Sequence, residues 1–224
     1  MPFSKVSETC IIILLFIGCS VLSAEDTDSP SPLGVRLYER EKASPGYNLY
    51  NDHSENFYLI DMEGTIIRHW IHRSSGKFNY AALTPKGELI ALGKNKLAIL
   101  DWNSQELFFQ RTNLHHDIAF LENGSFLTLG QQKIKYKGNF VRFDTLINVD
   151  PHGGQTEIWS SFNYLEQLQR FHPLTHHDDP DVAPYSRDQE NYYHCNSIQI
   201  LPDTPLGRMD ARFRAGNILL SARN

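Results

Sequence analysis

The feature that most constrains the fold is a group of short strand-like segments that recurs along the chain. Within each group, apolar-rich runs are separated by tight turns that contain Asp, Asn, Pro or Gly. An aspartate opens a turn at the same place in three successive groups, at Asp61, Asp101 and Asp150. An aromatic residue ends each of these groups, at Trp70, Phe109 and Trp159. The aspartates are about 40 and 49 residues apart, a spacing typical of propeller blades built from four short strands.

This pattern predicts an all-β fold, and specifically a β-propeller over residues 34–224. The repeat units are expected at about residues 46–75, 76–112, 113–163 and 192–224. A propeller closes with roughly four to eight blades, whereas these residues supply about three and a half. We therefore expect an incomplete propeller, which either is part of a longer protein or closes with a partner chain. A β-sandwich is the alternative fold.

The N-terminus has the layout of a signal peptide. Lys5 precedes the apolar run at residues 11–17, and the small residues Ser23 and Ala24 follow. We expect cleavage after Ser23 or Ala24, so that residues 1–24 direct export to the periplasm or the medium and residues 25–33 form a polar linker. Residues 16–19 loosely match a lipoprotein cleavage box with Cys19 as the lipidated residue. Membrane attachment, through that lipid or through an uncleaved anchor, is the alternative.

Composition excludes one class of partner and one kind of cross-link. The net charge is −5 and no basic run occurs, so nucleic acid is not an expected partner. Cys195 is the one cysteine that follows the signal segment, so the mature chain can form no internal disulfide. We interpret Cys195 as a small core residue, because no motif beside it supplies the rest of a Cys–His nucleophile. Nothing in the sequence indicates the oligomeric state.

Residues 160–191 interrupt the repeat. A short helix is expected at residues 163–171, capped by Ser161, and a loop rich in Pro and Asp follows it. This loop carries several potential metal ligands, which are His172, His176, His177, Asp178, Asp179 and Asp181. Their spacing matches no compact metal motif, so we expect a solvated acidic loop and no metal site.

Two histidines open the third unit on its innermost strand. Regular alternation along a strand would direct one of His115 and His116 toward the central channel and the other to the opposite face. An imidazole in the channel can act as an acid, a base or a donor to an anion near neutral pH. The alternative is that both rings are hydrogen-bonded groups that only cap the start of the strand.

His194 and Asn196 occupy the corresponding place in the fourth unit. Because they are two residues apart, a regular strand would direct both side chains to the same side. Arg223 ends the following strand, and its guanidinium can bind sulfate or phosphate oxygens in a bidentate manner. The sequence therefore predicts a site for an anionic ligand, with a buried polar network as the alternative.

Several of these segments together resemble the arylsulfotransferase (arylsulfate sulfotransferase) family over roughly residues 34–224. Pro-Gly-Tyr-Asn-Leu-Tyr at residues 45–50 and Tyr-Leu-Ile-Asp-Met-Glu-Gly at 58–64 resemble its opening, together with His-Trp at 69–70. Its internal motifs are matched by residues 115–117 (His-His-Asp), 121–124 (Leu-Glu-Asn-Gly), 194–197 (His-Cys-Asn-Ser) and 221–224 (Ser-Ala-Arg-Asn).

The resemblance implies an exported six-bladed propeller that moves a sulfuryl group from a phenolic sulfate ester to another phenol. The implied partners are small aryl sulfates and phenols, with neither a nucleotide sulfate donor nor another cofactor. By resemblance, His194, Asn196 and Arg223 would hold the sulfuryl oxygens, and His116 or its neighbour His115 would assist binding or proton transfer. We thus assign His116, His194 and Arg223 to catalysis and His115 and Asn196 to substrate binding.

Two departures from the family pattern affect this interpretation. The family's nucleophilic histidine lies in a later blade than those in this sequence, and residues 203–215 are inserted between His194 and Arg223. We therefore expect a chain that is catalytically incomplete as written. One alternative function is a non-catalytic extracytoplasmic propeller that binds ligands or a protein partner. Another is a structural surface protein in which the polar groups serve only the fold.

Overall fold

A computed structural model describes residues 35–52, 54–73, 76–136, 138–171 and 193–223. The expected signal peptide, the linker and the His- and Asp-rich loop lie outside these residues. Within them, no helix is both long and apolar enough to cross a membrane.

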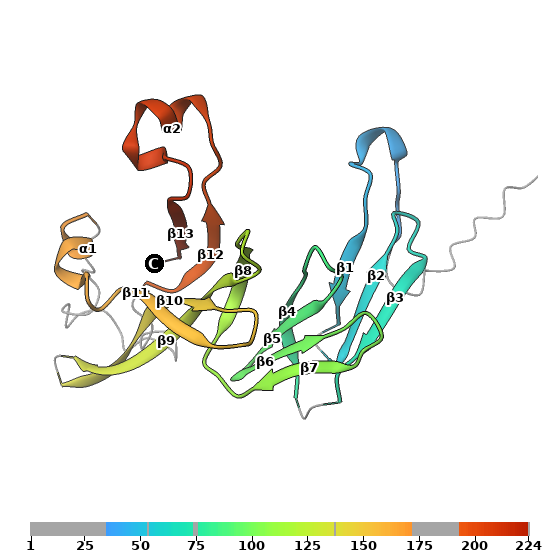
Figure 1. Ribbon diagram of the computed structural model, residues 1–224, viewed down its shortest axis with the longest axis horizontal. Helices are drawn as coiled ribbons and strands as arrows, with labels where there is room; N and C mark the ends of the chain where they lie inside the picture. Colours follow the sequence, from blue (N-terminus) through green and yellow to red (C-terminus); the bar gives the residue numbers. More distant parts are fainter. Residues whose placement is uncertain (1–34, 53, 74–75, 137, 172–192, 224) are drawn as a thin grey trace, which may run out of the picture.

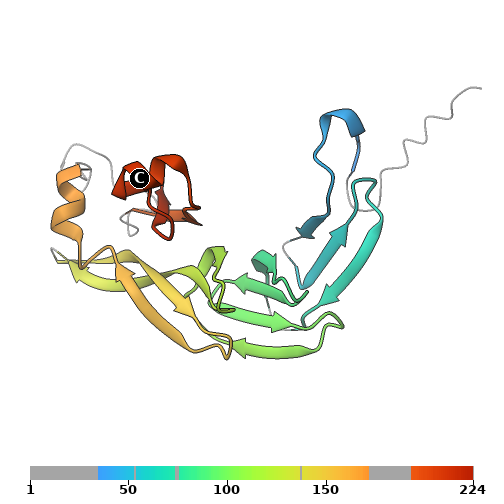
Figure 2. The same ribbon diagram turned by 45° about the horizontal axis from the view of Figure 1, so that its top comes forward.

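The strands form four antiparallel sheets that follow one another along an open arc (Figure 1, and from a second side Figure 2). The first sheet contains β1 (Asn48–Asn51), β2 (Asn56–Ile60) and β3 (Ile66–Ile71), and the second contains β4 (Phe78–Leu83), β5 (Leu89–Gly93), β6 (Lys96–Leu100) and β7 (Glu106–Gln110). The third contains β8 (His115–Phe120), β9 (Phe126–Tyr136), β10 (Asn139–Val149) and β11 (Gln155–Ser160), and the fourth contains β12 (Cys195–Ile200) and β13 (Ile218–Ala222). The all-β expectation is confirmed, and the arrangement is propeller-like.

The recurring aspartates form the same turn in each of the first three sheets. The Asp61 carboxylate accepts hydrogen bonds from the backbone N–H groups two and four residues later, at 3.1 and 2.7 Å. Asp101 does the same at 2.8 and 2.7 Å, and Asp150 at 2.7 and 3.0 Å. An Asp side chain that binds the backbone ahead of it stabilises a tight turn, which explains why this residue recurs.

These turns also align the sheets with one another. Asp101 and Asp150 follow the third strands of their sheets, β6 and β10, whereas Asp61 follows β2. By this alignment β1 corresponds to the second strands β5 and β9. The first sheet therefore shows no counterpart of the innermost strands β4 and β8 among the described residues.

The apolar core lies between successive sheets. Phe57 and Trp70 from the first sheet pack with Phe78 and Leu89 from the second, and all four are fully buried. The Trp70 indole N–H also donates to the carbonyl oxygen of Asp101 at 3.1 Å. A second cluster joins the second and third sheets through Ile90, Leu92, Leu114, Phe126 and Val149, and a third joins the third and fourth sheets through Leu129, Phe143, Cys195 and Ile198. The burial of Cys195 confirms its interpretation as a core residue.

The helix expected after the third unit is present as α1 (Leu165–Phe171), so its existence is confirmed and its start lies two residues later. The expected cap at Ser161 is wrong. The Ser161 hydroxyl is buried without a hydrogen-bond partner among the described residues, and its backbone N–H donates to the Asp144 carbonyl oxygen at 2.9 Å. Ser161 thus extends the pairing of β10 with the chain after β11 and does not begin the helix.

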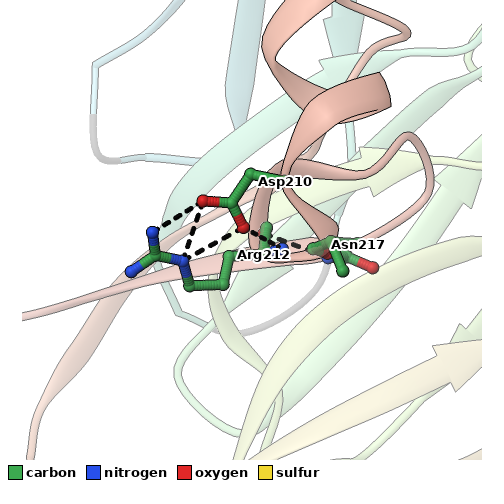
Figure 3. Close-up of polar contacts among 4 residues, drawn as sticks. Asp210, Arg212 and Asn217 are labelled. Atoms are coloured by element: carbon green, nitrogen blue, oxygen red, sulfur yellow. Dashed lines mark hydrogen bonds and ion pairs between the residues drawn. The ribbon is translucent and has the colours of Figure 1, made fainter.

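The segment inserted between β12 and β13 folds on itself. It contains α2 (Pro205–Met209) and the short 3₁₀ helix η4 (Ala211–Phe213). The Asp210 carboxylate binds the guanidinium of Arg212 at 2.6 to 3.1 Å, and the Asn217 side chain donates to the carbonyl oxygens of Ala211 and Arg212 (Figure 3). At its base, the Leu201 N–H donates to the Asn217 carbonyl oxygen at 2.8 Å, so the two strands leave and return in register.

Two turn glycines of the third sheet differ in one respect that can be tested. Gly124 and Gly153 both have left-handed φ angles, +83° and +86°. A Cβ at position 153 would lie 2.3 Å from the ring of Phe108 on the second sheet, whereas at position 124 the nearest atom is Pro151 Cγ at 3.6 Å.

We predict that Gly124→Ala lowers the free energy of unfolding by about 1–2 kcal/mol through backbone strain alone. Gly153→Ala should lower it further, because the new methyl group must displace Phe108. Urea unfolding followed by tryptophan fluorescence measures both. Equal losses for the two variants would show that the Phe108 ring can move aside without cost, so that its packing at this turn does not stabilise the contact between the two sheets.

Candidate functional site

Four of the five site residues predicted from the sequence come together where the third and fourth sheets meet. The rings of His115 and His116, at the start of β8, have centroids 4.7 Å apart and meet edge to face. The ring of His194, which directly precedes β12, lies 5.8 Å from that of His116. The Arg223 backbone N–H donates to the His194 carbonyl oxygen at 3.1 Å, which fixes the end of β13 beside the start of β12. The 203–215 insertion thus leaves these two residues adjacent.

The backbone carries the histidines in an unusual conformation. His116 and His194 have left-handed φ angles of 61° and 53°. In β8 the register shifts between His115 and Ile118, so the strand bulges at the histidine pair. The regular alternation expected for His115 and His116 is therefore wrong, and the two rings touch each other. Left-handed φ is uncommon outside glycine, although histidine adopts it more readily than β-branched residues do.

The structure does not bring Asn196 into this group. Its side chain is exposed, and the register of β12 shifts between Cys195 and Ser197. In the described part of the chain, no hydrogen bond or ring contact joins Asn196 to the imidazoles. The expectation that His194 and Asn196 share one side of a regular strand fails, because His194 precedes the strand in a left-handed conformation and a bulge follows it.

Burial keeps the imidazoles neutral. It lowers the pKa of His115 to about 4, and the neighbouring His116 and His194 act in the same direction, while the backbone of Gly130 opposes them. Burial also lowers the pKa of His116, with Asp117 opposing and Arg223 adding to the effect. Both rings are therefore uncharged near neutral pH, and an uncharged imidazole can accept a proton or donate an N–H.

Two carboxylates belong to the surroundings of the site, and neither was predicted from the sequence as a site residue. Asp117 directly follows the histidine pair and accepts hydrogen bonds from the Tyr80 hydroxyl and from the backbone N–H of Ile198. Its position in the His-His-Asp run was the available signal. Asp144 lies within β10, and no local pattern distinguishes it.

Asp144 is fully buried next to Cys195. Burial raises the pKa of its carboxyl to about 6, while the nearby N–H groups of Cys195 and His194 oppose the rise. Neither carboxylate oxygen makes a hydrogen bond of ordinary geometry with a described residue. Burial and the Asp144 carboxyl together raise the pKa of the Cys195 thiol to about 12, so this thiol is no nucleophile at neutral pH.

No group of three or more His, Cys, Asp or Glu side chains within the described ranges is placed to hold a metal ion. A cleft of about 470 Å³ lies at the outer strands of the first two sheets, and none of His115, His116 and His194 lines it. It is lined by His69, Ile71, His72, Arg73, Ser104 and Glu106. This cleft does not include the histidine cluster, in which His116 is exposed and His115 is partly buried.

Comparison with known proteins gives a family and two distant structural likenesses. The model of the family described as Arylsulfotransferase (ASST) matches residues 24–206. No curated protein matches the sequence significantly. A streptogramin B lyase is similar at 14% identity and a TM-score of 0.37, over 50% of this chain and 36% of the lyase. The computationally designed Ika4 protein is similar at 10% identity and a TM-score of 0.32, over 52% of this chain and 87% of the designed one. At these TM-scores neither likeness supports a conclusion about the chain.

The buried His115 predicts an acid-sensitive contribution to stability. The unfolded chain takes up a proton at this residue near pH 6.5, whereas the folded chain does so only near pH 4. The unfolded state therefore binds more protons in this window, and the contribution of His115 to stability is lost as the pH falls from about 6.5 to 4. Relative to His115→Gln, wild-type protein should lose stability on acidification, as measured by urea unfolding at a series of pH values. Parallel curves would contradict a neutral, buried His115.

The buried Asp144 predicts the opposite pH dependence of stability, namely a loss of stability as the pH rises. The folded carboxyl holds its proton up to about pH 6, whereas the unfolded one releases it near 3.8. The folded state then binds more protons, so stability falls as the pH rises through that window. Asp144→Asn should remove this loss and gain stability relative to wild-type protein between pH 4 and 6. Asp150→Asn, at an exposed turn, is the matched control and should show no such gain.

Proposed function

The chain belongs to the arylsulfotransferase family, and on this basis we propose that it acts in the transfer of a sulfuryl group from a phenolic sulfate ester to a phenol. The observation that supports the proposal is the convergence of His116, His194 and Arg223 at the ends of neighbouring strands. The family model spans residues of both contributing units, from His116 to His194.

These groups suit the charge that develops during sulfuryl transfer. The ester S–O bond breaks as the sulfuryl group passes to the carrier histidine of the family pattern, and the S–N bond to that histidine breaks as a new S–O bond forms to the acceptor oxygen. In the first of these steps negative charge spreads over the sulfuryl oxygens and the departing phenolate. The Arg223 guanidinium can bind two of these oxygens in a bidentate manner. Imidazole N–H groups add donors at the same place. An uncharged His116 can take the proton from the acceptor phenol, and the imidazolium so formed can give this proton to the phenolate that leaves the next donor ester, so the protons balance over one cycle.

In the family pattern, a histidine of a later unit carries the sulfuryl group. We therefore assign the described cluster to oxyanion stabilisation and proton transfer, and we assign the covalent step to a later unit of a six-unit propeller. His115 would support the ring of His116, which it touches. Asn196 would join the substrate contacts only after a rearrangement at the bulge that contains it.

We also propose that the protein is exported. The support is the sequence of residues 1–24, in which a short apolar run separates Lys5 from small residues. Lipidation at Cys19 and retention of the apolar run are two routes by which the protein could remain attached to a membrane.

The test is transfer from 4-nitrophenyl sulfate to phenol, with binding of phenyl sulfate measured separately by calorimetry. In a protein that includes the later unit with the nucleophilic histidine, we expect release of 4-nitrophenol that depends on the phenol acceptor. Arg223→Leu should lower kcat/KM about 100-fold, the usual loss when one oxyanion donor is removed. It should weaken phenyl sulfate binding as well.

Arg40→Leu is the matched control, because Arg40 is an exposed arginine in the short 3₁₀ helix Arg40–Lys42, which precedes β1, and it is paired with Glu63. Its transfer and binding should equal those of wild-type protein. Binding that depends on Arg223 without any transfer would favour the non-catalytic, ligand-binding alternative. Absence of both would contradict the proposed site.

A further inference from the structure

One carboxylate, that of Asp117, connects three of the four sheets. It accepts a hydrogen bond from the Tyr80 hydroxyl on β4 at 2.7 Å and another from the Ile198 backbone N–H on β12 at 2.9 Å. The N–H of its neighbour Ile118 on β8 donates to it at 2.9 Å. The strands β4, β8 and β12 are the first strands of their sheets and lie next to one another.

The bond to Ile198 takes a place that sheet pairing leaves open. Among the described strands, β12 pairs only with β13, so the N–H groups along its other edge have no backbone ladder partner, although β8 lies beside that edge. An unpaired and partly buried N–H lowers stability. Asp117 supplies the missing acceptor at Ile198, and a carboxylate is a stronger acceptor than a carbonyl oxygen.

The hydrogen bond from the Tyr80 hydroxyl attaches β4 of the second sheet to Asp117. Burial, together with the hydrogen bond to Asp117, raises the pKa of the Tyr80 hydroxyl to about 12. The hydroxyl therefore keeps its proton and remains a donor to Asp117 throughout the neutral pH range.

Asp117 also lies between the two backbone irregularities that carry the histidines. It sits within the bulge of β8, directly after the left-handed His116. Its second partner, Ile198, directly follows the bulge of β12, which begins after the left-handed His194. A single side chain thus ties one bulge to the other at short range.

We propose that Asp117 is a positioning residue, which locks the two left-handed bulges together and so sets the distance between the His116 and His194 rings. Its role in transfer rests on the proposed function, whereas its role in placing the rings does not. Asp117→Asn keeps one acceptor oxygen and replaces the other by an NH₂ group, which cannot accept. Because Tyr80 and Ile118 bind one carboxylate oxygen and Ile198 binds the other, the variant cannot hold both sheets at once. One bulge should then move relative to the other.

The first readout is the nuclear Overhauser effect between the ring protons of His116 and His194 in the isotope-labelled full chain. The signals are assigned by their absence in His116→Asn and His194→Asn. We expect the cross-peak in wild-type protein and its loss in Asp117→Asn. Asp150→Asn is the control, because it removes a carboxylate that accepts two backbone hydrogen bonds in the same sheet. It should lower stability and keep the cross-peak.

A cross-peak that persists in Asp117→Asn, or that also disappears in Asp150→Asn, would overturn the proposal. Should Asp117→Asn fail to fold, Tyr80→Phe carries the test, because it removes one hydrogen bond and keeps the carboxylate. Its cross-peak should weaken, and an unchanged one would also overturn the proposal.

The second readout is the pKa of His116 from the same spectra. The groups that face His116 are Asp117, which raises this pKa, and Arg223, which lowers it together with burial; the rings of His115 and His194 lie beside it. Removing the charge of Asp117 should lower the pKa further. A residue that only held the fold together would, when replaced, expose His116 and move the pKa upward toward 6.5, which would contradict the proposal.

In the transfer assay, Asp117→Asn should reduce kcat about 100-fold and leave KM nearly unchanged, as expected when reacting groups are misplaced. A rise in KM alone would contradict a positioning role. If wild-type protein transfers no sulfuryl group, the proposed function fails while the cross-peak still decides the role of Asp117.

Discussion

The structure depends on the packing of each sheet against the next. The second sheet shows this most clearly, since every residue of β5 is buried. One face of this sheet contributes Leu89 and Ala91 to the cluster shared with the first sheet, and the other contributes Ile90 and Leu92 to the cluster shared with the third. No sheet encloses a core of its own. Stability is therefore a property of neighbouring pairs, as in other repeat architectures, and the position of any strand end follows from a chain of such contacts.

The histidine cluster lies at the edges of β8 and β12 that are not hydrogen-bonded to another described strand. Within a sheet, strands satisfy one another's N–H and C=O groups, but among the described strands the first one of each sheet pairs along one edge only. At that edge side chains replace the missing backbone acceptors. The Asp117 carboxylate accepts the hydrogen bond of the Ile198 N–H on β12, which a carbonyl oxygen of a neighbouring strand would otherwise accept. Polar residues thus gather there for a structural reason. The same gathering places the rings of His116 and His194 beside each other, with the backbone of Arg223 hydrogen-bonded to His194.

The sequence predicted the all-β fold because its signals are local. An aspartate that binds the N–H groups two and four residues ahead needs no distant partner, and the alternation of apolar residues follows from the strand itself. It also predicted that His116, His194 and Arg223 would meet, because all three lie at corresponding strand ends.

The details of the site could not be predicted, since they depend on residues far apart in the chain. The bond between Asp117 and Ile198 joins positions 81 residues apart, and Asp144 acquires its environment only when β12 packs over it. Ser161 looked like a helix cap, but its hydroxyl accepts no hydrogen bond from the described helix backbone, because packing buries it at the end of β11.

The left-handed backbone at His116 and His194 has a consequence for how the site can vary. At these positions a β-branched residue is excluded by the main chain before any question of chemistry arises, whereas Gly and Asn fit without strain. A saturation mutagenesis library would therefore rank substitutions here by conformational tolerance as well as by reactivity. Evolution of the site toward a new ligand could therefore use only those residues that tolerate a left-handed φ at positions 116 and 194. The backbone conformation thus limits which ligands the site can come to bind.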